Sequence, residues 1–295
     1  MKPARFHYHD PERVEEVLGL LSEYGEDAKI LAGGQSLVPL MNFRLARPAH
    51  LVDINRISSL AYVSEQNGMM LIGAMTRQRA VEKSELVRRR NPLLVEASQY
   101  IGHPAIRNRG TVGGSLAHAD PAAEWPALAL AMNATVVLRS ARGERVVSAA
   151  DFFVTYLTSC LAPDELLTEI QVPCLPPESG WAFLELSRRH GDFALAGVAV
   201  WLKADATEVC TDAAISLVGV GPGPVRARKA EECLRGERLG EKLFQRVASI
   251  VSEELDPDSD LHASAEYRRH VAGVLTRRAL AIAQSRAGRN GGAGQ

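Results

Sequence analysis

Two stretches of the sequence combine adjacent glycines with small hydroxyl residues, the composition of a loop that binds phosphate. In the first, an apolar, strand-like run at residues 30–32 leads into Gly33, Gly34, Gln35 and Ser36. A Gly-Gly pair after a strand can adopt positive φ and turn its backbone N–H groups toward one anion, with no side chain in the way. One such turn is a weak signal, because hairpins and bulges use the same pair for geometry alone.

The second stretch, residues 108–120, repeats this chemistry. Gly113 and Gly114 are followed by Ser115 and Leu116, and the first pair is also followed closely by a serine and a leucine. Two loops of this type suggest the two phosphates of a dinucleotide. On these residues alone, two unrelated tight turns remain the alternative.

Two acidic residues follow the second glycine pair. Asp120 either caps a helix that begins at Pro121 or bonds a ribose or ribityl hydroxyl, and both interpretations stay open. Glu124 is a charge in an otherwise apolar helical segment, which favours a functional role. The polar residues 188–193 predict either a plain hairpin turn or a lid that carries Phe193 over a planar ring.

Two further groups of residues are given structural interpretations. The Gly-Val-Gly-Pro-Gly-Pro stretch at 219–224 follows a predicted strand, but Pro222 and Pro224 remove backbone donors that a phosphate would need. It is therefore predicted to be a structural turn. His7 and His9 would share one face of a strand, and without a third ligand nearby they are predicted to lie at the surface.

The composition is that of an ordinary globular protein. With 34 Lys and Arg against 35 Asp and Glu in 295 residues, no bulk charge attracts the chain to nucleic acid. The four cysteines are widely spaced, so we expect reduced thiols and neither an iron–sulfur cluster nor zinc held by this chain alone. The first residues do not form a signal peptide, and no apolar run is long enough to span a membrane. These features predict a cytoplasmic protein.

The elements that must position these residues alternate between helix and strand. Apolar residues at 14, 17, 18 and 21 predict a helix that starts at Asp10-Pro11 and ends at Gly25. A short helix is expected over 37–45, with its N-terminus beside the first glycine pair, where its dipole would favour an anion. A hairpin is expected around Asn67-Gly68. The other elements expected before residue 173 are helices at 76–83, 92–101 and 122–132 and strands at 51–54, 135–138, 145–147 and 167–172.

Three prolines within residues 173–177 predict a linker and a domain boundary. Beyond the linker, three strands and then three helices predict an α+β domain. These are expected at 181–187, 198–203 and 213–220 for the strands and at 229–234, 241–255 and 266–285 for the helices. The predicted organisation is therefore two α/β subdomains at 1–56 and 57–175, a C-terminal α+β domain with a three-stranded sheet at 176–286, and a flexible tail at 287–295.

Three motifs in this order resemble the FAD-binding medium subunit of molybdenum hydroxylases, the family of carbon monoxide, nicotine, caffeine and xanthine dehydrogenases. They are Ala-Gly-Gly-Gln-Ser-Leu at 32–37, Thr-Val-Gly-Gly-Ser at 111–115 with Ala-Asp-Pro at 119–121, and Arg-His-Gly-Asp-Phe-Ala at 189–194. The similarity extends from Phe6 to about Arg286. It implies an α+β protein with an FAD-binding fold of the vanillyl-alcohol-oxidase type in the two subdomains.

The resemblance also implies which residues contact FAD. The two glycine stretches would wrap the pyrophosphate through backbone N–H groups and hydroxyls, Asp120 or Glu124 would lie near the ribityl chain, and an apolar and an aromatic residue would lie near the isoalloxazine. No catalytic or metal-binding residue is implied. The implied cofactor-binding residues are Ala32, Gly33, Gly34, Gln35, Ser36, Leu37, Thr111, Gly113, Gly114, Ser115, Asp120, Glu124, Leu161 and Phe193.

Two residues depart from the family pattern, since relatives often carry lysine where Glu185 stands and some carry tyrosine where Phe193 stands. A lost positive charge near the flavin would disfavour its anionic reduced form.

The function that the resemblance implies is electron transfer. A large molybdopterin subunit would hydroxylate a substrate, a small subunit with [2Fe–2S] clusters would relay electrons, and this chain would pass them through FAD to an external acceptor. The implied assembly is a dimer of heterotrimers. One alternative is a stand-alone FAD oxidoreductase with His118 or His190 as a base. Another is a non-catalytic nucleotide-binding or assembly subunit.

Overall fold

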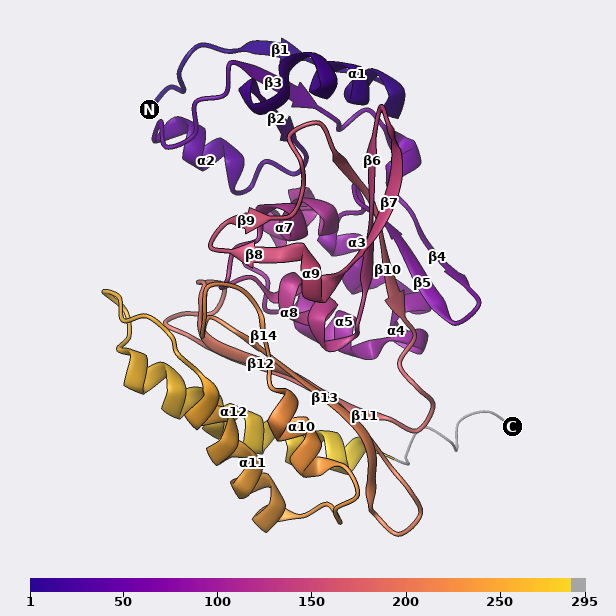
Figure 1. The fold of residues 1–295 in the computed structure, drawn as a ribbon, viewed down its shortest axis with the longest axis vertical. Helices are drawn as coiled ribbons and strands as arrows, with labels where there is room; N and C mark the ends of the chain where they lie inside the picture. The colour runs from indigo at the N-terminus through magenta and orange to yellow at the C-terminus, as the bar shows by residue number, and fades with distance from the viewer. Residues whose placement is uncertain (288–295) are drawn as a thin grey trace.

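The computed structural model describes residues 1–287, so most of the predicted tail lies outside the described residues. Three sheet-containing parts follow one another along the long axis of the molecule, from the N-terminal part at one end to the C-terminal part at the other (Figure 1). Three clusters of buried apolar side chains lie mainly in one part each, and the cluster of the middle part also includes residues of the C-terminal sheet such as Phe183 and Trp201. No helix among residues 1–287 combines the length and the apolar character that crossing a bilayer requires.

The N-terminal part is a three-stranded parallel sheet in the order β1-β3-β2. The apolar stripe of helix α1 is buried against this sheet, as its spacing predicts, and Gly25 ends the helix with a positive φ of 48°. The elements are β1 (His7–His9), α1 (Val14–Tyr24), the short 3₁₀ turn Gly25–Asp27, β2 (Ala28–Leu31), α2 (Leu37–Asn42), β3 (His50–Asp53) and a second 3₁₀ turn at Ser58–Leu60.

The predicted start of helix α1 at Asp10-Pro11 is wrong, because the helix begins at Val14. The carboxylate that accepts hydrogen bonds near the start of the helix belongs to Glu16, a residue of the helix itself. Glu16 accepts hydrogen bonds from the backbone N–H of Glu12, at 3.0 Å, and from the guanidinium of Arg13. Glu16, in the first turn of the helix, therefore satisfies an N–H that lies just before the helix.

The middle part is a five-stranded antiparallel sheet in the order β4-β5-β10-β6-β7. The hairpin predicted around Asn67-Gly68 joins β4 and β5. Helices α5 and α8 of this part pack against the sheet of the C-terminal part, next to β12 (Figure 1). The elements are β4 (Val63–Gln66), β5 (Met69–Gly73), α3 (Gln78–Lys83), α4 (Glu85–Arg90), α5 (Pro92–Ser98), α6 (Pro104–Arg109), α7 (Val112–His118), α8 (Glu124–Ala131), β6 (Thr135–Ser140), β7 (Gly143–Ser148), α9 (Ala149–Phe152), β8 (Phe153–Thr155), β9 (Thr158–Ser159) and β10 (Leu166–Pro173).

The C-terminal part is an antiparallel sheet in the order β11-β12-β13-β14, covered on one face by three helices. The prediction of a three-stranded sheet is wrong, because the sheet has a fourth, short strand. Val225 and Arg226 form this strand by pairing with the edge of β13. The elements are β11 (Gly180–Ser187), β12 (Ala194–Ala204), β13 (Cys210–Val218), β14 (Val225–Arg226), α10 (Arg228–Leu234), α11 (Glu241–Glu254) and α12 (Ala265–Arg286).

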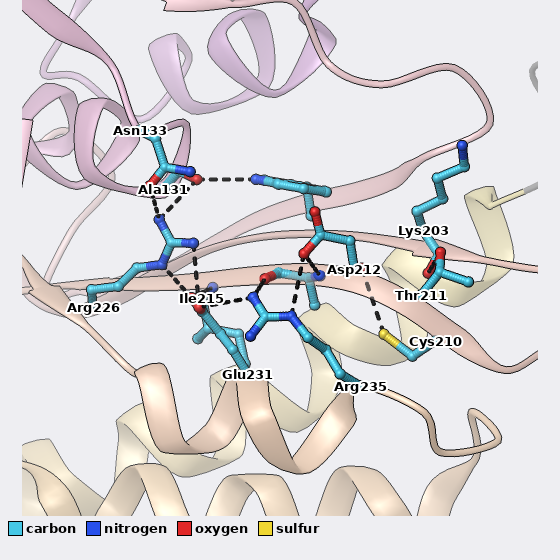
Figure 2. A network of polar contacts seen from close by, with 12 residues as sticks. Ala131, Asn133, Lys203, Cys210, Thr211, Asp212, Ile215, Arg226, Glu231 and Arg235 are labelled. Atoms are coloured by element: carbon cyan, nitrogen blue, oxygen red, sulfur yellow. Dashed lines mark hydrogen bonds and ion pairs between the residues drawn. The ribbon is translucent and has the colours of Figure 1, made fainter.

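Contacts with distant residues explain the extra strand. Figure 2 shows the guanidinium of Arg226 between the carboxylate of Glu231 and the C-terminal end of α8. The guanidinium donates to the Ala131 carbonyl at 3.2 Å and to Asn133 Oδ1 at 3.1 Å. The indole of Trp201 donates to the same Ala131 carbonyl at 3.0 Å. These bonds fix the C-terminal sheet to α8, which contributes to the cavity described next. The division of the chain after residues 56 and 175 stays a prediction.

Candidate cofactor-binding site

A cavity of about 1480 Å³ lies where the three parts of the molecule meet. It is lined by both glycine stretches and by residues of the C-terminal part that are more than 70 positions further along the chain. Most of its lining residues come from segments within 21–46, 101–124, 156–165, 188–195 and 219–268. The fold therefore brings the two predicted phosphate loops to one site.

The first glycine stretch is an open loop between β2 and α2. Gly34 has a φ of 74°, in the left-handed region that the sequence analysis predicted for this pair. Within the described residues, the backbone N–H groups of Gly34, Gln35 and Ser36 make no hydrogen bond. The same loop also borders a smaller cavity of about 360 Å³ on the side of Asp53. Three unpaired donors thus follow one another along this loop.

The second glycine stretch has a different backbone. The expectation of positive φ at Gly113 and Gly114 is wrong, because both residues belong to the first turn of helix α7. Thr111 is the N-cap, and its hydroxyl oxygen accepts the N–H of Gly114 at 3.1 Å. The N–H groups of Val112, Gly113 and Ser115 are also bonded, to backbone carbonyls. The predicted wrapping of an anion by these N–H groups is therefore not available here, but the Ser115 hydroxyl has no partner among the described residues and lines the cavity.

The sequence analysis placed Thr111, Gly113, Gly114 and Ser115 of this stretch at the cofactor. Of these four, only Gly113 does not line the cavity. Its N–H donates to the carbonyl of Ala74 at 2.9 Å. A Cβ built on Gly113 would lie 2.5 Å from the Ala74 Cβ, which is too close for any side chain. This glycine is required because helix α7 packs directly on the end of β5.

The two stretches lie against each other. A Cβ built on Gly33 would lie 2.5 Å from the carbonyl oxygen of Arg109 and 2.7 Å from the Cα of Gly110. A Cβ on Gly114 would lie 3.6 Å from the Cβ of Ala32. Gly33 is thus a point of backbone-to-backbone contact between the loops, and the residues with free N–H groups in one loop line the same cavity as Ser115 of the other.

Asp120 and Glu124 both line the cavity. Asp120 does not cap α8, because the helix begins at Glu124 with Ala123 as its N-cap. Its carboxylate instead accepts the N–H of Ala122 at 2.9 Å, in a turn that precedes the helix. Glu124 is buried, and burial, together with the charge of Asp120, raises the pKa of its carboxyl group to about 7.

The turn between β11 and β12 forms part of the cavity wall, and the choice between a plain turn and a lid stays a prediction. Phe193 lines the cavity with 71% of its surface exposed, and Leu161 faces the same cavity from the segment after β9. Gly191 has a φ of 90°, and a Cβ there would lie 2.7 Å from the ring of His103. The turn is therefore held against the loop before α6.

Several cavity residues were not found by the sequence analysis. Arg268 of α12 is buried and donates to the carbonyls of Leu195, at 2.6 Å, and Gly219, at 2.9 Å. Gly219 was noticed only as part of a turn, and it also lines the cavity. Tyr156 lines the cavity and donates to Asp258. Only Gly219 of this set carried a signal in the sequence, because the Arg268–Leu195 and Tyr156–Asp258 contacts join residues about 70 to 100 positions apart.

The histidines have two different environments. His118, the possible base, lines the cavity. His7 is exposed and His9 is half-buried, and both stack on His50. Among residues 1–287, no group of three or more His, Cys, Asp or Glu side chains could hold a metal ion.

The chain matches two family models that together span nearly its whole length. Residues 4–175 match a model described as the FAD binding domain in molybdopterin dehydrogenase. Residues 181–283 match the CO dehydrogenase flavoprotein C-terminal domain.

Similar proteins also cover nearly the whole chain. It is 44% identical over 287 residues to the 6-hydroxypseudooxynicotine dehydrogenase complex subunit alpha of Paenarthrobacter nicotinovorans, covering 97% of each protein. It is 42% identical to the caffeine dehydrogenase subunit beta of a Pseudomonas species, again over 97% of each. Among solved structures, it is similar to a carbon monoxide dehydrogenase of Hydrogenophaga pseudoflava that lacks the Mo-pyranopterin moiety of the molybdenum cofactor, with a TM-score of 0.95, 40% identity and coverage of 97% of this chain and 100% of that one.

Proposed function

Because the chain belongs to the family of FAD-binding medium subunits of molybdenum hydroxylases, we propose that it binds FAD in the cavity and passes electrons through it to an external acceptor. The chain is an oxidoreductase subunit, as its relatives are. The observation that carries the proposal is the meeting of the two glycine stretches at one cavity. FAD supplies the redox chemistry, and the protein supplies binding, orientation and electrostatics.

The residues of the cavity fit a dinucleotide. The free N–H groups of Gly34, Gln35 and Ser36 are donors of the kind that hold a pyrophosphate, and the Ser115 hydroxyl adds a donor from the second stretch. No side chain can block this region at Gly33, where the loops touch. We assign the pyrophosphate to this part of the cavity.

The remaining cofactor residues keep the roles that the resemblance implies. Asp120 and Glu124 lie further along the same wall, where carboxylates accept hydrogen bonds from ribityl hydroxyls. Leu161 and the exposed ring of Phe193 offer the apolar surface for a planar ring. Phe193 lacks the hydroxyl of tyrosine, so it contributes contact area without a hydrogen bond to the ligand.

The partners in the proposal are a large subunit with the molybdopterin cofactor and a small subunit with [2Fe–2S] clusters, in a dimer of heterotrimers in the cytoplasm. The similarity to a carbon monoxide dehydrogenase supports such partners. The four cysteines of this chain are all free thiols. The named relatives act on chemically unrelated molecules, so the substrate of the complex is not assigned to this chain.

The test is an absorption spectrum of the purified chain, followed by denaturation and identification of the released cofactor. A two-banded flavin spectrum and released FAD are expected, and molybdenum and iron should co-purify when the chain is isolated from its own cells. A colourless protein that takes up no added FAD would contradict the proposal. Reduction of the flavin by a small substrate, without any partner subunit, would favour the stand-alone oxidoreductase with His118 as its base.

A further inference from the structure

One buried arginine links two segments of the cavity wall. Arg268, near the start of α12, lines the cavity, and its side chain is 9% exposed. Its Nη1 atom donates to the carbonyl oxygens of Leu195, at 2.6 Å, and Gly219, at 2.9 Å. Leu195 is the second residue of β12, and Gly219 directly follows β13. A single guanidinium nitrogen therefore holds the start of one strand beside the end of another.

The carbonyl of Leu195 belongs to a β-bulge. In the pairing of β11 with β12, the register shifts between Leu186 and Ser187, and Leu195 is the extra residue on β12. A bulge leaves its extra residue outside the regular ladder and bends the strand, and here the guanidinium of Arg268 bonds the carbonyl of that residue. The turn that carries Phe193 leads into this bulge, so the direction of the turn depends on how the bulge is held.

Gly219 connects the link to a third segment of the wall. Its N–H donates to the carbonyl of Pro121 at 2.9 Å, next to Asp120. Gly219 has a φ of 71°, and a Cβ there would lie 3.0 Å from the carbonyl oxygen of Ala194 and 3.1 Å from that of Leu195. The turn after β13, which the sequence analysis interpreted as structural, is therefore packed directly on the bulge.

The charge of Arg268 is paired with a carboxylate that its own loop holds in place. The Nη2 atom donates to Asp260 Oδ2 at 2.7 Å. Oδ1 of the same carboxylate accepts the N–H groups of His262, at 2.8 Å, and Ala263, at 2.9 Å. A buried cation with a bonded counter-ion and two carbonyl acceptors has one preferred position. The loop between α11 and α12 therefore positions the guanidinium without any ligand.

We propose that Arg268 is a positioning residue of the cofactor site, which fixes the turn carrying Phe193 relative to the segment carrying Asp120. The guanidinium holds the bulge and the glycine turn together, and the N–H of that glycine holds the segment before α8. The wall of the cavity is thereby formed before the ligand arrives. The inference rests on the proposed function, because FAD is the ligand that this wall receives.

The test compares two buried arginines that have the same kinds of partner. Arg226 has a side chain that is 8% exposed and bonds one carboxylate and the carbonyls of Leu130 and Ala131, but it does not line the cavity. Arg226→Met should lose at least as much stability as Arg268→Met, because the carboxylate of Glu231 that it leaves is buried, whereas that of Asp260 is half-exposed.

Only Arg268→Met should bind FAD more weakly, as measured by titration of the protein without cofactor. The dissociation constant should rise about tenfold if the released wall keeps its binding arrangement about a tenth of the time. The visible circular dichroism of the bound flavin should also change in Arg268→Met and not in Arg226→Met. The same FAD affinity in the two variants would show that Arg268 only stabilises the fold, and it would overturn the proposal.

Gly219→Ala tests the same link without removing a charge, and it serves if Arg268→Met does not fold. Its Cβ must move away from the carbonyls of Ala194 and Leu195, so this variant should also bind FAD more weakly. Gly236→Ala is the matched control, because Gly236 has a φ of 77°, no atom within 4 Å of its Cβ position and no place in the cavity lining. Native FAD affinity in Gly219→Ala would overturn the proposal.

Hydrogen exchange of the protein without FAD separates this inference from the proposed function. Peptides that cover residues 188–198 and 215–224 should exchange faster in Arg268→Met than in Arg226→Met, because only the first variant loses the link between these segments. Equal exchange in the two variants would overturn the proposal. A native protein that takes up no FAD would instead overturn the proposed function, and the exchange rates would still decide whether Arg268 holds the wall.

Discussion

The two glycine stretches have nearly the same sequence chemistry, but the fold uses them differently. The first is a left-handed loop at Gly34 whose next N–H groups are unpaired among the described residues. The second is the capped first turn of α7, in which the backbone N–H groups are already bonded to the protein. One stretch therefore offers backbone donors, and the other supports it by packing and adds a hydroxyl.

The comparison shows why a Gly-Gly pair is an ambiguous signal. Glycine is needed at Gly34 for its φ, at Gly33 for contact with another backbone and at Gly113 for contact between α7 and Ala74. All three requirements select the same residue type. The substitutions below separate them, because each requirement predicts a different balance between lost stability and lost FAD affinity.

The largest effect is expected for Gly33→Ala. Its Cβ would lie 2.5 Å from the Arg109 carbonyl oxygen, so the two loops must separate. We expect a loss of about 1–3 kcal/mol of stability and loss of bound FAD, measured by the absorbance ratio of flavin to protein. Gly19→Ala, in α1 with no atom within 4 Å, is the matched control and should retain FAD. Full flavin occupancy in Gly33→Ala would refute the placement of the pyrophosphate.

Gly113→Ala should reduce stability more than FAD affinity. The new methyl group would clash with Ala74 rather than enter the cavity, at a cost of about 1–3 kcal/mol in unfolding free energy. The double variant Ala74→Gly/Gly113→Ala should recover part of this loss, which chemical denaturation would measure. If Gly113→Ala instead lost FAD and kept native stability, this glycine would belong to the binding surface.

Gly34→Ala and Gly68→Ala form a matched pair, with φ values of 74° and 77°. An alanine in this region costs about 1–2 kcal/mol in either place. Gly34→Ala should lose at least as much stability as Gly68→Ala, because a Cβ on Gly34 would also lie 3.1 Å from the side chains of Leu31 and Val38, whereas a Cβ on Gly68 would have nothing within 4 Å. Only Gly34→Ala should bind FAD more weakly, as measured by titration of the protein without cofactor. Equal FAD affinity in the two variants would mean that the first loop does not contact the ligand.

The smallest effect is expected at the helix cap. Thr111→Ala removes the acceptor for the Gly114 N–H and should cost about 1 kcal/mol of stability. Thr111→Ser keeps the acceptor and should restore most of this loss. Thr111→Ala should weaken FAD binding less than Gly34→Ala does. If Thr111→Ala weakened FAD binding more than Gly34→Ala, the threonine hydroxyl would belong to the cofactor site.

Much of the fold was predictable because short-range patterns reflect it. The apolar stripe of α1, the hairpin at Asn67-Gly68 and the long strands of the C-terminal sheet form where periodicity and turn residues predict them. The start of α1 was mispredicted although it depends on the nearby Glu16, whereas the edge strand was missed because a contact with a distant residue decided the local structure. Arg226 forms the edge strand β14 because it is bonded to α8, nearly a hundred residues earlier in the chain.

The sequence by itself determined the family, through three ordered motifs, and the residue types that line the cavity. Only the tertiary structure decided which glycine is free to bind and which is packed, because φ and close backbone contact depend on neighbours such as Arg109 and Ala74. It also decided that Glu124 is buried on the cavity wall, where burial and the charge of Asp120 raise the pKa of its carboxyl group to about 7. Burial and neighbouring charge depend on the folded surroundings, and neither can be read from residue types along the chain.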